Sequence, residues 1–167
     1  MEFTKRVCES LQDEHYATIA LLNRLGQLTA RHRRGNPPNV SDHEVRQLLS
    51  DLSTAITTEV RRHFSFEEDC IFTYLEEIGD GQICTHLTDE HRVILPLGLR
   101  IAKLAGAAAA QGFDEAGWNA FFPIAQEFCE RLQAHIQKEE MALLPLLEEN
   151  MSAETDARLF QEHAEIV

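Results

Sequence analysis

Two similar stretches of sequence decide the fold: HFSFEE at residues 63–68 and HIQKEE at residues 135–140. In each stretch a histidine precedes a glutamate by four positions, which places both side chains on one face of an α-helix, rotated by only ~40°. The apolar residues around them also recur at helical spacing, and no strand pattern competes. The sequence therefore predicts two helices that each project a His–Glu pair from an apolar face.

Both stretches belong to a weak internal repeat. LQDEH at residues 11–15 corresponds to LTDEH at residues 87–91, and LEE at residues 75–77 corresponds to LEE at residues 147–149. Each half of the repeat has the pattern of a helical hairpin. Two such hairpins packed about a pseudo-twofold axis would bring one histidine from each of four helices to a single level of the core.

Turn and capping signals predict where the helices begin and end. Gly35 ends the first helix, and a capping box at residues 41–44 starts the second. Pro96 is expected to interrupt and kink the third helix, Pro145 to end the fourth, and Ser152 to cap a short fifth. The predicted helices cover residues 4–34, 41–78, 82–110, 114–145 and 152–166.

Four long helices with short connections predict an all-α fold: an antiparallel up-down four-helix bundle with a short C-terminal fifth helix. The length of 167 residues and the absence of a linker-like stretch predict one domain over residues 1–167.

Charge and composition narrow the function classes. The 15 Lys and Arg residues against 28 Asp and Glu residues give a net charge of −13, which disfavours binding to nucleic acid or to an anionic membrane surface. The N-terminal residues have no apolar signal core, and the third helix carries too many charges to span a bilayer. Four scattered cysteines form no disulfide framework, so we expect a cytoplasmic protein with reduced thiols.

The four histidines of the repeat lie on the apolar stripes of their helices and are predicted to point into the core. Two glutamates accompany them, and a buried carboxylate without a partner is strongly unfavourable. No Lys or Arg shares these stripes, so two divalent cations would best balance the charge. Imidazole with carboxylate suits iron, and also zinc or manganese. The candidate metal ligands are His15, His63, Glu67, His91, His135 and Glu139.

These elements resemble the hemerythrin-like proteins, also called HHE cation-binding domains. The resemblance covers almost the whole chain and rests on two Glu-His pairs and two His-x-x-x-Glu stretches, at residues 14–15, 90–91, 63–67 and 135–139. It implies an antiparallel four-helix bundle that holds a non-haem di-iron centre. In that centre one iron would be bound by His15 and His63, the other by His91 and His135, with Glu67 and Glu139 as bridges.

The chain differs from the oxygen-carrying members of that family at one ligand. Those members hold five histidines, two of them four residues apart on the third helix, whereas Leu87 and Leu95 stand at that spacing from His91. His86 is rotated by ~140° from His91 and is not expected to reach the metals. Four histidines look more like the bacterial branch linked to iron–sulfur cluster repair and nitric oxide stress. That branch usually carries a further cysteine-containing N-terminal domain, which this sequence lacks.

Three positions have alternative interpretations. Glu140 can replace Glu139 as a bridge, just as Glu68 can replace Glu67, although the facing geometry favours the earlier glutamate of each pair. Tyr74 either forms a hydrogen bond near the site or packs in the core.

Predictions for the periphery concern thiols, further histidines and aromatic residues. Cys8 and Cys70 are expected to act as small core hydrophobes. Histidines near helix ends or in the tail are expected to be solvated, namely His32, His43 and His163. An exposed aromatic face that can hold a homodimer is expected around Trp118, Phe121 and Phe122.

The predicted function is to bind or sense a small diatomic ligand, O2 or NO, at an open iron position. One alternative is an enzyme that reduces peroxide or NO with a redox partner, using Tyr74 or a thiol as the donor. Another is iron storage or donation, aided by the acidic surface.

Overall fold

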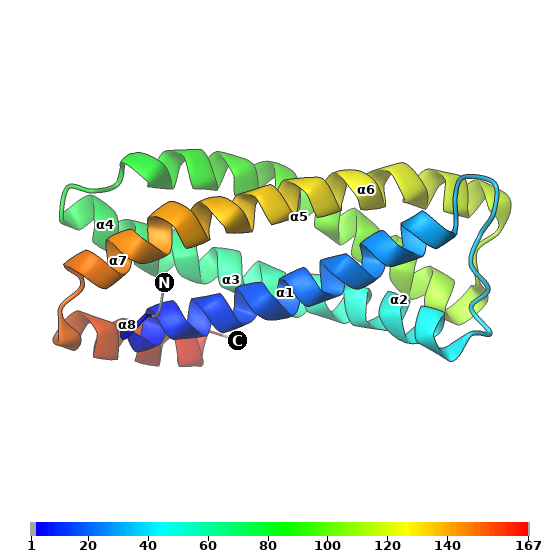
Figure 1. Ribbon diagram of the computed structural model, residues 1–167. Coiled ribbons are helices and arrows are strands. Elements are labelled where there is room, and N and C mark those ends of the chain that lie inside the picture. The colour runs from blue at the N-terminus through cyan, green and yellow to red at the C-terminus, as the bar shows by residue number, and fades with distance from the viewer. Residues whose placement is uncertain (1–2, 167) are drawn as a thin grey trace.

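The computed structural model describes residues 3–166, which contain helices and connecting segments but no strand. Four long helical runs lie side by side, as Figure 1 shows. They are α1 (Arg6–Arg31); a second run of α2 (His43–Ala55), α3 (Arg61–Phe66) and α4 (Phe72–Glu77); α5 (Gln82–Gln111); and a fourth run of α6 (Glu115–Lys138) and α7 (Leu144–Asn150). A shorter helix, α8 (Ala153–Glu165), follows and packs against α1.

Each long run contacts two others. α1 packs against α2 and α6, and α5 packs against the same two helices. Successive runs cross the length of the molecule in alternating directions in Figure 1. The prediction of an all-helical protein is confirmed for the described residues.

Two predicted helix boundaries are wrong for local reasons. The second run is capped by Asp42 and not by Ser41, because Oδ1 of Asp42 accepts the backbone N–H of Glu44 at 2.9 Å. The fourth run does not end at Pro145, which lies in the first turn of α7, where a missing backbone N–H is tolerated. Pro96 lies inside α5, and the helix continues through it.

The start of α1 is capped by residues that are distant in sequence. Glu148 of α7 accepts the backbone N–H groups of Thr4 and Lys5, each at 3.0 Å, and Asp156 of α8 accepts that of Val7 at 3.0 Å. Carboxylates at this end also oppose the partial positive charge of the helix N-terminus. The C-terminal part of the chain therefore helps to hold α1 in place.

Three segments within the long runs are π-helical: η1 (Ile56–Val60), η2 (Glu67–Ile71) and η3 (Glu139–Leu143). The wider π turn changes which way successive side chains face, and such turns are frequent at functional sites. η2 and η3 begin at corresponding positions of the internal repeat, each at the glutamate of a His–Glu pair. The apolar periodicity of the sequence gives no sign of these segments.

The buried apolar side chains form two clusters. On α1, Leu11 belongs to the smaller cluster and Leu22 to the larger one, and His15 lies between them. On α5, Leu87 belongs to the smaller cluster, while Leu95 packs against the larger one, with His91 between them. A buried polar layer thus separates two apolar cores.

The prediction of an exposed aromatic face is wrong. Trp118 and Phe121 are 0% exposed, and Phe122 is half-buried. The indole Nε1 of Trp118 donates a hydrogen bond to the backbone oxygen of Arg33 at 3.0 Å. Trp118 therefore packs against the segment that follows α1, and its ring and that of Phe121 lie inside the larger apolar cluster.

The third run, α5, is long and apolar enough by length and composition to cross a membrane, with a mean hydropathy of 1.6 over 18 residues. Core helices pass the same test. In this fold α5 packs against α2 and α6 and carries His91 into the polar layer.

Candidate metal centre

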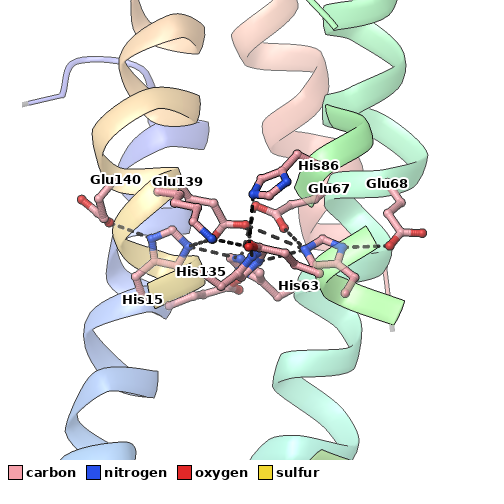
Figure 2. A network of polar contacts seen from close by, with 12 residues as sticks. His15, His63, Glu67, Glu68, His86, His135, Glu139 and Glu140 are labelled. Atoms are coloured by element: carbon pink, nitrogen blue, oxygen red, sulfur yellow. Dashed lines mark hydrogen bonds and ion pairs between the residues drawn. The ribbon is translucent and has the colours of Figure 1, made fainter. Parts of the chain in front are cut away.

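All six predicted ligand residues meet in the polar layer, and Figure 2 shows part of this network. Each of the four histidines is at most 7% exposed, and Glu67 and Glu139 are 0% exposed. Their side-chain donor atoms form two groups in which every atom lies within 4.8 Å of the others: His15, His63, Glu67 and Glu139, and Glu67, His91, His135 and Glu139. Both groups share the two glutamates, as two neighbouring metal positions with common bridges require.

The histidines are paired through the ring nitrogens that face the centre. The Nε2 atoms of His15 and His63 are 3.2 Å apart, and those of His91 and His135 are 3.0 Å apart. One pair therefore comes from α1 and α3, and the other from α5 and α6.

Each central glutamate reaches one histidine of each pair. The carboxylate oxygens of Glu139 lie 3.1 Å from Nε2 of His15 and 2.7 Å from Nε2 of His135. Those of Glu67 lie 3.4 Å from Nε2 of His63 and 3.3 Å from Nε2 of His91. Both carboxylates thus lie between the two histidine pairs.

The outer nitrogen of each histidine meets a further glutamate. The Nδ1–carboxylate distances are 2.7 Å for His15 with Glu140, 2.7 Å for His63 with Glu14, 2.8 Å for His91 with Glu68 and 2.9 Å for His135 with Glu90. An ionised carboxylate only accepts, so each Nδ1 donates and the Nε2 lone pair is left facing the centre. Each of the first three helical runs therefore supplies a glutamate that orients the histidine of the next run. The glutamate of the fourth run orients the histidine of the first run.

These contacts show where the residues of the open alternatives lie. Glu68 and Glu140 lie at opposite edges of the network in Figure 2, each against an outer histidine nitrogen, while Glu67 and Glu139 lie between them. His86 contacts Glu90 at 3.2 Å, and its side chain is 62% exposed. It therefore stays at the periphery, as expected.

The central atoms fit bound cations. All four carboxylate oxygens of Glu67 and Glu139 are buried without a hydrogen-bond partner among the described residues. The Nε2 atoms of the four histidines lie 2.7–3.4 Å from these oxygens, and an Nε2 atom that carries no proton repels a carboxylate oxygen at such distances. Cations remove this conflict, and the combination of imidazole nitrogen and carboxylate oxygen suits iron.

The sequence matches the family described as Hemerythrin HHE cation binding domain over residues 7–147, and again over residues 85–167. The chain belongs to this family. The second match begins in α5, where the second hairpin of the internal repeat begins. No curated protein matches the sequence significantly.

In this hemerythrin domain the adjacent glutamates at the start of two π turns have different contacts. Glu67 and Glu139 are the first residues of η2 and η3, and both point to the centre. The next residues, Glu68 and Glu140, contact histidines of neighbouring runs. The Glu-Glu doublets of the sequence were the available sign that each stretch holds one central and one outer carboxylate.

Contacts with the glutamates favour the protonated form of His15, His63 and His91 in the hemerythrin domain without metal. Burial lowers the pKa of His91, but contacts with Glu139 and Glu67 raise it to about 9. The pKa of His63 also rises, since Glu67 and Glu14 outweigh burial. Burial raises the pKa of Glu139, but its histidine contacts hold it well below the usual range. Metal ions must therefore displace protons to bind.

Two of the outer glutamates have cationic partners. Oε1 of Glu14 lies 2.6 Å from Arg62 and 3.0 Å from Nε2 of His163, and Glu90 pairs with Lys138. The expectation that His163 is solvated is wrong, because its side chain is only 12% exposed. Helical periodicity within α8 gave no sign of this contact with α1.

Aromatic rings enclose one half of the centre. Phe64 stacks on His91 with ring centroids 3.8 Å apart, and Phe72 stacks on the same imidazole at 5.9 Å. Tyr74 packs elsewhere, since its hydroxyl donates to the backbone oxygen of Asn150 at 3.1 Å. Cys8 is buried as expected, whereas Cys70 is only partly buried.

Proposed function

We propose that this chain is a single-domain di-iron protein that binds or senses a small diatomic ligand, O2 or NO, within an antiparallel up-down four-helix bundle. Two irons would be held by His15 with His63 and by His91 with His135, with Glu67 and Glu139 shared between them. When bound, iron with an open coordination position supplies the affinity for a diatomic molecule.

The observation that carries this proposal is an apolar cavity of about 120 Å³ beside one half of the centre. Its polar lining includes the candidate ligands His15, His63 and Glu139, together with Glu14, Thr18 and Glu59. Its apolar wall comes from α1, the second run and α6, and includes Leu21, Leu22, Ile56, Val60, Phe64, Phe128, Leu132 and Ile136. A volume of this size suits a ligand of a few atoms and is too small for a metabolite-sized substrate.

The cavity and the aromatic rings make the two halves unequal. Apolar side chains beside His15 and His63 favour an uncharged ligand over bulk water, because transfer of apolar molecules out of water is favourable. His91 is instead covered by Phe64 and Phe72. We infer that the external ligand enters on the His15–His63 side.

The residues offer less support for the two alternatives. A reductive enzyme would need a nearby donor, but the Tyr74 hydroxyl is engaged by Asn150. Burial raises the pKa of the Cys84 thiol to about 11, so it stays protonated. Iron storage requires room for many ions, whereas the described residues form two overlapping donor groups. Four free cysteines favour a reducing compartment, and we propose the cytoplasm.

Anaerobic addition of NO to the ferrous protein tests this proposal. The iron-loaded chain is expected to give new visible absorption bands that saturate with NO, and the zinc-loaded chain, which offers no redox-active metal, is the control. A chain that holds two ferrous ions but shows no spectral change with either NO or O2 would contradict it.

A further inference from the structure

The C-terminal helix α8 reaches the metal centre through His163. This side chain is only 12% exposed, and its ring packs edge-on against Phe66 with centroids 4.7 Å apart. Phe66 precedes Glu67 and is 0% exposed. His163 therefore lies in a fixed position directly outside the polar layer.

A short chain of contacts joins His163 to a candidate iron ligand. Its Nε2 lies 3.0 Å from Oε1 of Glu14, whose other oxygen, Oε2, lies 2.7 Å from Nδ1 of His63. Glu14 is thus placed by His163 from α8 on one side and orients His63 on the other. Arg62 is the second group at Oε1, at 2.6 Å.

A second anchor fixes α8 relative to α1. Asp156 is 7% exposed and accepts the backbone N–H of Val7, and Leu159 is fully buried in the smaller apolar cluster. The guanidinium of Arg6 lies over the ring of Phe160, 4.6 Å from its centroid. α8 therefore contacts the first turn of α1, and it contacts α1 again at Glu14, two turns further along that helix.

The corresponding glutamate of the other half, Glu90, also contacts a histidine, but that histidine is an exposed residue of the same helix, α5, and not a residue of α8. Glu90 orients His135. It pairs with Lys138 of α6, the helix that carries His135, and with His86 of α5, whose side chain is 62% exposed. Among the described residues, α8 therefore supplies a contact partner to Glu14 but shows none to Glu90.

We propose that His163 is a positioning residue for the metal centre: it fixes Glu14, and through Glu14 the His63 imidazole, so that docking of α8 and metal binding at the His15–His63 half are coupled. This inference rests on the metal centre of the proposed function. It goes beyond that function by giving α8 a role at the His15–His63 half of the centre. Because binding couplings are reciprocal, a metal in that half also stabilises the docked tail.

Cobalt(II) titration of the metal-free full-length chain, followed by visible absorption, tests the positioning role. His163→Phe keeps a ring against Phe66 but removes the nitrogen, and His163→Gln restores a polar nitrogen within reach of Glu14. Arg158→Ala, on the exposed side of α8, is the matched control. The wild-type chain should bind two ions. His163→Phe should weaken one of them by roughly threefold to tenfold, less than the 10–100-fold loss typical of removing a direct partner of a ligand. His163→Gln should recover most of the loss.

Two outcomes would overturn the inference. Equal binding of both ions by His163→Phe and wild type would show that His163 does not position His63. Equal weakening of both ions would show a general structural effect. A wild-type chain that bound no cobalt would overturn the proposed function together with this inference, and a chain that bound cobalt normally but ignored NO as the ferrous protein would overturn the proposed function alone.

Hydrogen exchange on the wild-type chain tests the reciprocal effect without any substitution. Backbone amides of α8 should exchange at least several times more slowly in the cobalt-loaded chain than in the metal-free chain. Identical exchange of α8 in the two forms would contradict the coupling.

Discussion

Glu14 of α1 and His63 of α3 lie 2.7 Å apart, from carboxylate Oε2 to imidazole Nδ1, and three equivalent contacts complete a circuit around the four helical runs. The contact fixes the tautomer of His63, so that its Nε2 lone pair faces the centre. Loss of one such carboxylate should therefore weaken metal binding although no ligand is removed.

Glu14→Gln is expected to lower metal affinity by 10–100-fold, the range seen for partners of metal-bound histidines. The amide oxygen is a weaker acceptor than the carboxylate, and the His63 imidazole becomes less basic. Competition against a chelator of known affinity measures the change. Glu9→Gln, an exposed substitution on the same helix, is the control. Equal affinities for Glu14→Gln and wild type would show that the outer contact has no influence on the metal.

The stability of the metal-free protein should decrease as the pH rises above about 6.5, because the histidines of the centre have raised pKa values. The folded-state pKa of His91 is about 9 against an ordinary value of 6.5, and those of His15 and His63 are also raised. Their stabilisation is fully present below about pH 6.5 and is lost as the pH rises toward 9. The outer carboxylates Glu90 and Glu140 have lowered pKa values, so their contribution is lost as the pH falls below 4.5.

Thermal unfolding of the chelated protein checks this pH dependence. The melting temperature should be highest between about pH 5 and 6.5 and should fall by several degrees by pH 9. A melting temperature that rose steadily from pH 6.5 to 9 would contradict the assignment of protonated histidines to the metal-free centre.

The absence of a fifth histidine should shorten the life of the ferrous protein in oxygen. Leu95 lies one turn from His91 and packs against the apolar cluster that lines the cavity, whereas Leu87 belongs to the other cluster. Leu95→His is expected to slow oxidation by O2 severalfold, because a further imidazole would occupy an open position at the His91–His135 half, where water or a second anion can otherwise enter. Stopped-flow absorbance after mixing ferrous protein with oxygen gives the rate.

Leu87→His is the comparison, since it adds the same group on the side away from the cavity. An unchanged rate in Leu95→His, or an equal slowing in both variants, would remove the link between the missing histidine and oxidation.

Cavity volume should control how fast the diatomic ligand arrives. Ile56 is 1% exposed and forms part of the cavity wall, on the same helical run as His63. Ile56→Phe should fill the cavity and slow NO association, while Ile56→Ala should enlarge it and speed association. Ile56→Ala also costs roughly 2–5 kcal/mol of stability. Flash photolysis or stopped-flow mixing measures both rates, and rates insensitive to both changes would place the entry route elsewhere.

The sequence predicted the helices and the central residues because both depend on local spacing. The pairing of His63 with Glu67 and of His135 with Glu139 follows from the helical period alone. The same period predicted that the earlier glutamate of each doublet faces inward, and the structure places Glu67 and Glu139 there.

Features set by contacts between distant residues were not predicted. Glu148 and Asp156 cap α1 from more than a hundred residues away, so no local signal at Lys5 reveals them. The contact of His163 with Glu14 depends on how α8 docks, which helical periodicity does not encode. Trp118 and Phe121 were expected on a surface, but both are buried in the larger apolar cluster, and Trp118 contacts a connecting segment whose path the sequence did not show.

The central claim is that six residues from two similar hairpins hold two metal ions per chain. Metal analysis of protein produced with ample iron, in wild type and in Glu139→Ala and Glu140→Ala, tests it most directly. The account predicts two iron ions in the wild type, loss of most metal in Glu139→Ala, and two more weakly held ions in Glu140→Ala. One ion or none in the wild type, or full occupancy in Glu139→Ala, would contradict it.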